Sequence, residues 1–298
     1  MFFCPKQSPS LQWGLLRREK HPPRNDMMFL IPMNEHDIQK KLSGLPLGKI
    51  RYFDSIGSTN DEALAWAAQG VHDLSIVIAD EQIAGRGRLK RKWFTPKGTA
   101  LAFSLVLRPS EAERSYPART VGLGALALAS ACLELGLHAQ IKWPNDVLLE
   151  KKKVAGILVE SVWTGDALDA LVLGLGVNVL AASVPPADQV LFPATSLESE
   201  LGHSVDRADI LCTILSALLL WRSKLGTDEF LKAWEDVLAF RGEQVQIFKD
   251  NESPIMGKLL GLAPDGGLRL REANNNILTI QFGEIHLRPP CDRITILR

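Results

Sequence analysis

The sequence has no net charge, few cysteines and no long apolar run. Its 34 basic and 34 acidic residues cancel, so the chain lacks the overall positive field that general nucleic-acid binding requires. No run approaches the roughly 20 apolar residues needed to span a bilayer. The first 26 residues mix Arg, Lys and Pro where a signal peptide needs an apolar core. We expect a cytoplasmic protein with no membrane partner.

Four cysteines and six histidines are present, and neither set has the spacing of a metal centre. The cysteines are widely separated and form no CxxC pair, which argues against a zinc site and a dense disulfide framework. The GxxxxGK[ST] phosphate loop and the GxSxG nucleophile elbow are also missing from the sequence. These absences argue against a Walker-type NTPase and an α/β-hydrolase.

Hydrophobic patterning divides the 298 residues into three parts. Residues 1–45 show no sustained period, so we expect a poorly ordered N-terminal leader there. Residues 46–239 alternate strand-like and helix-like segments, which predicts an α+β domain with a mixed β-sheet and helices packed on one side. Residues 240–298 contain only short strand-like runs separated by turns, which predicts a small C-terminal β-barrel domain.

Helices are expected after Ser58, over residues 121–135 and over residues 205–239. In the first of them, Thr59 and Glu62 have the spacing of a capping box. A hairpin is expected at residues 151–152. The expected strands are residues 51–53, 75–80, 100–107, 140–143, 146–150, 153–162, 170–179, 244–248, 255–262, 268–271, 277–282 and 284–288.

The loop over residues 85–93 has two glycines, five cationic side chains and one tryptophan. Glycine lets the backbone approach a ligand closely, and guanidinium groups match phosphate and carboxylate geometry in a fixed fork. Gln82, just before the loop, offers both a donor and an acceptor. These features indicate a loop that closes over an anion. A solvated cationic face has the same composition, and basic residues with aromatic ones also bind single-stranded nucleic acid.

Three further segments carry polar or small residues at strand ends. In Lys142-Trp143-Pro144-Asn145-Asp146, the Asn-Asp pair is typical of a turn, and Asp146 is also a hard ligand suited to Mg²⁺ with substrate phosphates. Lys153 heads an otherwise apolar strand, where a lysine costs desolvation unless it meets an anion. The small residues of the segment 174–179 allow either close backbone approach or packing.

Six motifs in this order resemble those of the biotin protein ligases, or biotin–[acetyl-CoA-carboxylase] ligases: Ser58-Thr59-Asn60, Gln82, GRGRxxRxW, KWPND, KxAGILVE and GLGVNV. The resemblance covers about residues 50 to 298. It implies a class II synthetase-like catalytic domain with a small SH3-like β-barrel at the C-terminus. It also implies an ATP-dependent enzyme that activates biotin as biotinoyl-5′-AMP and transfers it to a lysine of a biotin carboxyl carrier protein.

The resemblance also implies a role for each matched residue. Lys153, Arg88 and Arg91 are expected to be catalytic by stabilising charge, because the reaction requires no protein nucleophile. The residues expected to bind biotin are Ser58, Thr59, Asn60, Gln82, Gly85, Arg86, Arg88, Trp93, Lys153 and Gly156. The residues expected to bind the nucleotide are Arg88, Arg91, Lys142, Asn145, Lys153, Asn178 and Phe192, and Asp146 is expected to serve Mg²⁺.

The sequence departs from the family pattern in two places. Members that repress biotin genes carry an N-terminal winged helix-turn-helix, whereas about 45 unpatterned residues precede the core here, so we expect no DNA partner. The loop that folds over adenine is poorly matched around residues 187–193, where Leu191 and Phe192 are expected to cover the base.

Two questions stay open at the level of sequence. A lipoate ligase or octanoyltransferase shares the catalytic fold and also acylates a carrier lysine. The GRGRxxRxW loop and the C-terminal β domain favour biotin over these alternatives. Whether the chain is a monomer or a homodimer joined through a sheet edge is not decided.

Overall fold

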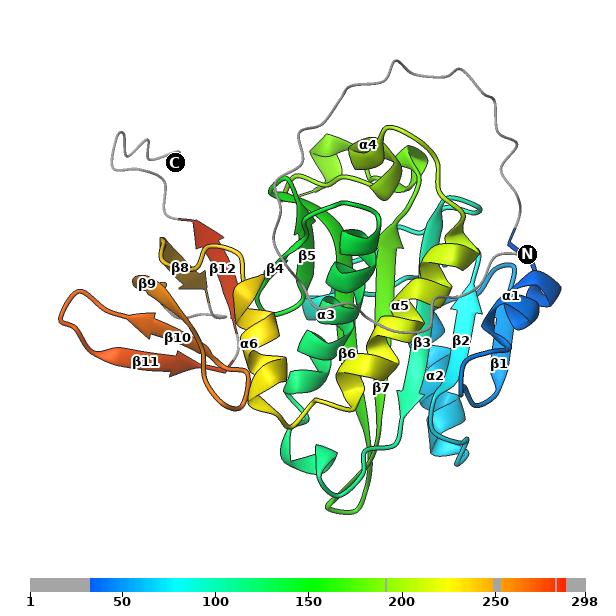
Figure 1. Ribbon diagram of the computed structural model, residues 1–298, viewed down its shortest axis with the longest axis horizontal. Helices are drawn as coiled ribbons and strands as arrows, with labels where there is room; N and C mark the ends of the chain where they lie inside the picture. The colour runs from blue at the N-terminus through cyan, green and yellow to red at the C-terminus, as the bar shows by residue number, and fades with distance from the viewer. Residues whose placement is uncertain (1–32, 191, 249–252, 282, 288–298) are drawn as a thin grey trace.

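The computed structural model describes residues 33–190, 192–248, 253–281 and 283–287. These residues form two β-sheets, one of seven strands and one of five, together with six α-helices and four short 3₁₀ turns. Figure 1 shows the smaller sheet beside the larger one, next to α6. Among the helices of these residues, none combines the length and apolarity that crossing a bilayer requires.

The larger sheet has the strand order β1-β2-β3-β7-β6-β5-β4. Its strands are β1 (Ile50–Phe53), β2 (Ser75–Ala79), β3 (Ala100–Leu107), β4 (Gln140–Lys142), β5 (Asp146–Leu149), β6 (Lys152–Thr164) and β7 (Ala167–Asn178). The β1–β2 pair is parallel and the other neighbours are antiparallel, so the predicted mixed sheet is confirmed. Glu150 and Lys151, both at positive φ, turn β5 into β6, as a tight hairpin requires.

Helices cover both faces of this sheet. The helices are α1 (Glu35–Leu42), α2 (Thr59–Ala68), α3 (Arg119–Glu134), α4 (Leu197–Leu201), α5 (Arg207–Arg222) and α6 (Asp228–Asp236). Side chains of α1, α3, α5 and α6 share the main core with Ile76 and Phe103, and Figure 1 shows α3 and α5 lying across this face. Because successive strand residues point to opposite faces, Val77 and Val106 instead pack against Trp66 of α2. The expectation of helices on one side therefore fails for α2.

The prediction that residues 1–45 form a poorly ordered leader is wrong for its last part. Residues 1–32 lie outside the described residues, but residues 35–42 form helix α1, whose N-cap Asn34 accepts a hydrogen bond from the backbone N–H of Asp37 at 2.9 Å. Ile38 and Leu42 are fully buried in the main core. A short amphipathic helix that docks on α5 needs only these two apolar residues, and this is too weak a pattern to stand out in the sequence.

Two helix predictions also need correction. The helix expected over residues 205–239 is divided into α5 and α6, and the Thr227 hydroxyl caps α6 by accepting from the backbone N–H of Phe230 at 3.3 Å. The capping box at Thr59 and Glu62 does not form, because Ser58 is the N-cap of α2 and Thr59 contacts Gln82 instead.

The smaller sheet is antiparallel, with the order β11-β10-β9-β8-β12. Its strands are β8 (Gln244–Phe248), β9 (Ile255–Leu262), β10 (Leu268–Arg271), β11 (Ile277–Ile280) and β12 (Glu284–Leu287). Trp143 Nε1 donates to the carbonyl of Gly266 at 3.0 Å, and the guanidinium of Arg119 donates to the carbonyl of Pro264. These bonds fix the small sheet against the large one. A closed SH3-like barrel and a domain boundary at residues 239–240 stay predictions.

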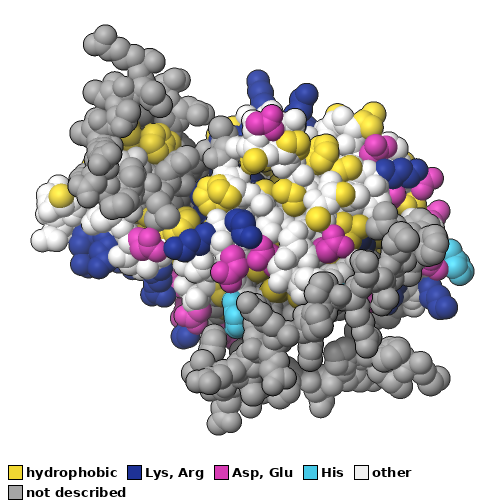
Figure 2. Space-filling view, turned by 90° about the horizontal axis from the view of Figure 1, so that it is seen from above, with side chains coloured by type: hydrophobic (Ala, Val, Ile, Leu, Met, Phe, Trp, Pro, Cys, Tyr) yellow, Lys and Arg dark blue, Asp and Glu magenta, His cyan; other side chains and the backbone are white. Residues whose placement is uncertain are grey.

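The balance of charge extends to the surface. On the face that Figure 2 shows, basic and acidic side chains of the described residues lie interspersed. This distribution agrees with the cancelling charges of the sequence. An anionic ligand must therefore be bound by a local cluster of cationic side chains and not by the overall charge of the protein.

Candidate active site

A cavity of about 420 Å³ lies on the α2 face of the larger sheet. It is lined by every site residue that the sequence predicts except Gly85: Ser58, Thr59, Asn60, Gln82, Arg86, Arg88, Arg91, Trp93, Lys142, Asn145, Asp146, Lys153, Gly156, Asn178 and Phe192. These residues come from the start of α2, the segment after β2, the glycine–arginine loop (residues 85–93), the strands β4 to β7 with the turn between β4 and β5, and the segment after β7. The six motifs thus meet at one place.

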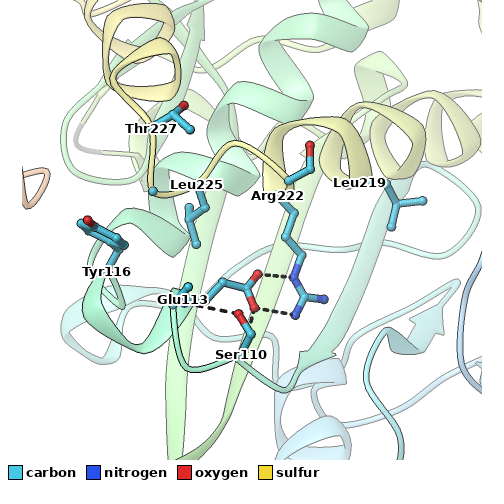
Figure 3. A pocket seen from close by; sticks show the side chains of 10 residues that line it. Ser110, Glu113, Tyr116, Leu219, Arg222, Leu225 and Thr227 are labelled. Atoms are coloured by element: carbon cyan, nitrogen blue, oxygen red, sulfur yellow. Dashed lines mark hydrogen bonds and ion pairs between the residues drawn. The ribbon is translucent and has the colours of Figure 1, made fainter.

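A second cavity, of about 550 Å³, lies between the loop after β3 and the end of α5 (Figure 3). Its charged groups satisfy each other, because Arg222 Nε lies 2.7 Å from Glu113 Oε1 and the backbone N–H of Ser110 donates to Glu113 Oε2 at 2.8 Å. Burial raises the pKa of Glu113, but the bonds from Arg222 and Ser110 outweigh burial and hold that pKa below its usual value. No sequence-predicted site residue lines this cavity, which we assign to stability.

A hydrogen-bonded network forms where α2 begins. The backbone N–H and the hydroxyl of Thr59 both donate to Gln82 Oε1, at 2.8 and 3.1 Å, and Gln82 Nε2 donates to the Thr95 hydroxyl at 3.1 Å. The Ser104 hydroxyl donates to Asn60 Oδ1 at 2.6 Å and lies 2.8 Å from the Thr59 hydroxyl. This buried network fixes the orientation of both amides before a ligand arrives.

The network includes residues that the sequence analysis missed. Ser104 is the one polar residue in β3, whose other residues are apolar, and this isolation was a usable signal. Thr95 carried no comparable signal. Glu160 ends the KxAGILVE motif but was given no role, because its partner Asn60 is 100 positions away in the sequence.

Two glycines of β7 give the cavity a floor of bare backbone. A Cβ at Gly174 would collide with the Asn60 amide, and a Cβ at Gly176 would collide with the Trp93 indole. Gly156 of β6 lies opposite Gly176 and also faces the Trp93 ring, which its Cβ would approach to 3.2 Å. Close approach, rather than simple packing, is therefore the reason for these small residues.

The indole of Trp93 leaves one donor unused. Its Nε1 is buried, and no acceptor for it occurs among the described residues. An unpaired buried N–H costs about 1–3 kcal/mol. The buried Nε1 of Trp234 is also unpaired, but Trp234 does not line the cavity. Trp93 lines the cavity, and a ligand acceptor is therefore expected at this point.

The glycine–arginine loop closes on itself as a small hairpin. The backbone N–H of Trp93 donates to the carbonyl of Gly85, and that of Gly87 donates to the carbonyl of Arg91, both at 2.8 Å. A Cβ at Gly85 would strike the Trp93 carbonyl. Gly85 therefore lets the loop close and does not line the cavity. Arg88 Nη1 donates to Asn145 Oδ1 at 3.2 Å, which joins the loop to the other side of the cavity.

Cations gather beyond Trp93. Lys153 Nζ lies 2.6 Å from Asp146 Oδ1 and 5.4 Å from the centroid of the Trp93 ring. The lysine at the head of the apolar strand therefore meets an anion, as its desolvation cost requires. Lys142 Nζ lies 4.3 Å from the centroid of Phe192, a distance typical of a cation–π contact.

The backbone of Lys153 is held by residues 193–195, at the end of the segment where the adenine-covering loop is expected. Its N–H donates to the carbonyl of Pro193 at 2.7 Å, and its carbonyl accepts from the N–H of Thr195 at 2.9 Å. Asn178 Nδ2 donates to the Thr195 carbonyl at 2.9 Å. The side chain of Asn178 thus supports the segment that carries Phe192. Leu191 lies outside the described residues.

Among the residues that line the cavity, Asp146 is the one carboxylate. The described ranges contain no group of three or more His, Cys, Asp or Glu side chains that could hold a metal ion. Mg²⁺ in nucleotide sites is usually held by one or two carboxylates together with substrate phosphates. This donor set fits an Mg²⁺ ion that arrives with a nucleotide, and it does not fit a metal centre built by protein alone.

The sequence is similar to those of known proteins. Residues 52–178 match the model of the biotin/lipoate A/B protein ligase family. The biotin–[acetyl-CoA-carboxylase] ligase of Paracoccus denitrificans is 38% identical over 225 residues, which are 72% of this chain and 90% of that protein. The bifunctional ligase/repressor BirA of Bacillus subtilis is 32% identical over 260 residues, covering 86% of this chain and 79% of that one.

A solved structure extends the similarity to three dimensions. The biotin protein ligase from Aquifex aeolicus in complex with biotin and ATP aligns with a TM-score of 0.69 and 29% identity. The alignment covers 81% of this chain and 99% of that one. The chain belongs to the biotin protein ligase family.

Proposed function

We propose that this chain is an ATP-dependent biotin protein ligase, which activates biotin as biotinoyl-5′-AMP and transfers it to a lysine of a biotin carboxyl carrier protein. The observation that carries the proposal is the succession of groups along β7. Gly174 lies against Asn60 of the polar network, and Gly176 lies against Trp93. Lys153 borders the same cavity beyond Trp93, near Gly156. The cavity thus has the polar network at one end, the indole of Trp93 as a wall and Lys153 at the other end. This order suits biotin bound next to a nucleotide.

The polar network suits the biotin head. A ureido group has two N–H donors and one carbonyl acceptor, all of which need partners when buried. Ser58, Thr59, Asn60 and Gln82 offer hydroxyl and amide groups of both kinds at the cavity wall. The unpaired Nε1 of Trp93 adds one donor. We assign these residues to biotin recognition.

In the first half-reaction, a carboxylate oxygen of biotin attacks the α-phosphorus of ATP. A new O–P bond forms, the bond between the α-phosphorus and the bridging oxygen breaks, and pyrophosphate leaves. The two reactants are both anions, so cations must bring them together. We assign this task to Lys153, Arg88 and Arg91, which act by position and charge.

In the second half-reaction, the amine of a carrier lysine attacks the carbonyl carbon of the mixed anhydride. An amide bond forms, AMP leaves with the electron pair of the C–O bond, and the attacking nitrogen loses a proton. The protein contributes geometry and charge stabilisation, and no covalent intermediate with the chain is needed.

The remaining assignments concern the nucleotide and its surroundings. Phe192 and Lys142 border the cavity, and we assign the ring of Phe192 to contact the adenine base. Asn178 supports the segment that carries Phe192 through its bond to Thr195. Asp146 and Asn145 are suited to Mg²⁺ on the nucleotide phosphates, where the ion would neutralise phosphate charge. We place the reaction in the cytoplasm, where ATP is supplied. A homodimer through a sheet edge stays a prediction.

The test is transfer of biotin to a carrier. The protein is incubated with ATP, Mg²⁺, biotin and a biotin carrier domain, and the mass of the carrier is followed. We expect one biotinoyl group on one lysine, and none without ATP. A lipoate ligase shares the fold, so lipoate is added in competition. Preferential lipoylation, or no acylation at all, would contradict the proposal.

A further inference from the structure

Arg86 is held by two carboxylates that do not line the cavity. Its Nη1 and Nη2 donate to Glu160 Oε1 and Oε2 at 3.0 and 2.7 Å, and its Nη2 lies 2.6 Å from Asp61 Oδ1. A bidentate pair of this kind fixes the plane of the guanidinium as well as its position. The hydrogen bond to Glu160 is the main cause that raises the pKa of Arg86 above its usual value. The guanidinium thus faces protein acids, although the sequence analysis expected it to face biotin.

Glu160 also holds the polar network of the cavity. Its Oε2 accepts from Asn60 Nδ2 at 2.8 Å, and Asn60 Oδ1 accepts from the Ser104 hydroxyl. One carboxylate on β6 therefore joins the loop, through Arg86, to the first turn of α2. These segments are far apart in the sequence, since Glu160 lies 74 positions from Arg86 and 100 positions from Asn60.

The point of attachment matters because the backbone hydrogen bonds of the hairpin are internal to it, while the Arg88 side chain bonds Asn145 on the other side of the cavity. The hairpin bonds of Gly85 with Trp93 and of Gly87 with Arg91 keep its shape, but they do not fix the hairpin on the sheet. Five cations in nine residues repel one another when no anion is bound. The Arg86 fork supplies an anchor at the base of the hairpin, from which Arg88 and Trp93 are directed at the cavity.

We propose that Glu160 is a positioning residue, which holds the glycine–arginine loop over the cavity through Arg86 and orients Asn60 at the same time. Its role in the reaction rests on the function proposed above. Loss of the anchor removes no group that the reaction uses, but it lets the loop, and Arg88 and Trp93 with it, leave the cavity more often. The account therefore predicts a higher KM for biotin and faster escape of biotinoyl-AMP, with a smaller change in kcat at saturating biotin.

The test compares Glu160→Gln with Glu62→Gln. Both changes remove one negative charge, and Glu62 is engaged by Arg51 of β1, at 2.5 Å, and not by Arg86. The ligand-free proteins are digested with trypsin, and the rate of cleavage within residues 86–92 is measured by mass spectrometry. Because the Arg86 fork is partly exposed, we expect about five- to tenfold faster cleavage in Glu160→Gln. The KM for biotin should rise by a similar factor, and Glu62→Gln should match the wild type.

A second variant protects the test against misfolding. Arg86→Lys keeps the charge but loses the bidentate fork, and it should reproduce the effect of Glu160→Gln. In the double variant the two effects should not add, since both remove the same contact. Wild-type cleavage and KM in Glu160→Gln, or full additivity in the double variant, would overturn the proposal. Because the digestion needs no substrate, it tests the anchoring role of Glu160 independently of activity. A wild-type protein that forms no adenylate would contradict only the proposed function.

Discussion

Lys153 Nζ and Asp146 Oδ1 lie 2.6 Å apart inside the cavity, between the neighbouring antiparallel strands β6 and β5. Their side chains are 26% and 17% exposed, so a ligand can still reach them. An ammonium group has three donors, and one carboxylate oxygen leaves the others available. The pair therefore holds a cation at a fixed place without using up its capacity to bind anions. The account of the reaction depends on this arrangement.

Removal of the ammonium is the first test of that arrangement. We expect Lys153→Ala to fold normally and to form biotinoyl-AMP at least about tenfold more slowly, because a charge-assisted hydrogen bond contributes about 1.5–3 kcal/mol. Adenylate formation is followed by release of pyrophosphate. Lys151→Ala, which removes an exposed cation from the neighbouring turn, is the control and should retain the full rate. A wild-type rate in Lys153→Ala would remove the residue from the catalytic set.

The glycines that line the cavity predict that biotin binding is sensitive to one added methyl group at Gly176. Gly176→Ala places a Cβ against the Trp93 indole, which has to move out of the wall. We expect the KM for biotin to rise at least about tenfold, with a loss of stability of about 1–3 kcal/mol. Gly44→Ala is the matched control, because a Cβ there meets no atom within 4 Å. Unchanged biotin affinity in Gly176→Ala would show that the floor is not part of the biotin site.

The unpaired donor of Trp93 predicts effects of opposite sign on binding and stability. Trp93→Phe keeps an aromatic wall but removes the buried Nε1–H, whose unpaired state is costly. We expect the ligand-free protein to be as stable as the wild type or more so in urea unfolding. Biotin should bind about five- to tenfold more weakly in calorimetry. Equal biotin affinity would mean that the ligand offers this donor no acceptor.

The second cavity predicts a dependence of stability on pH. The pKa of Glu113 is lower in the folded protein than in the unfolded chain, so the unfolded chain binds more protons at acid pH. The contribution of Glu113 is therefore complete above about pH 4.5 and is lost as the pH falls through its folded value. Glu113→Gln should lower the free energy of unfolding by about 1–2 kcal/mol at pH 6, allowing for solvent screening.

The same comparison at acid pH supplies the control. On acidification from pH 6 to below pH 4.5, the difference in stability between wild type and Glu113→Gln should shrink, because the wild-type carboxyl loses its charge as the pH falls towards its lowered pKa. A difference that stays the same over this range of pH would show that the carboxylate charge is not what Arg222 and Ser110 stabilise.

The sequence predicts best where a pattern is local. The strand at Ala100–Leu107 has the predicted bounds, because a continuous apolar run between turns has few alternatives. The capping box at Thr59 failed because a residue 23 positions away, Gln82, competes for the same hydroxyl. Tertiary contacts of this kind leave no trace in local spacing.

The site shows the same division. The residues of the six motifs lie together in the fold, since nearly all of them line one cavity, and their roles towards a ligand stay predictions. What the motifs could not reveal is which charged groups face each other. Arg86 was expected to face biotin, yet its fork lies on Glu160, and pairing across strands depends on the sheet order that only the fold supplies.

The most direct test of the central claim needs neither a carrier nor a variant. The purified protein is mixed with ATP, Mg²⁺ and biotin, separated from free ligand, and its bound small molecules are identified by mass spectrometry. The account predicts biotinoyl-5′-AMP bound at about one molecule per chain, with release of an equal amount of pyrophosphate. Intact biotin and ATP recovered side by side, with no adenylate and no pyrophosphate, would contradict it.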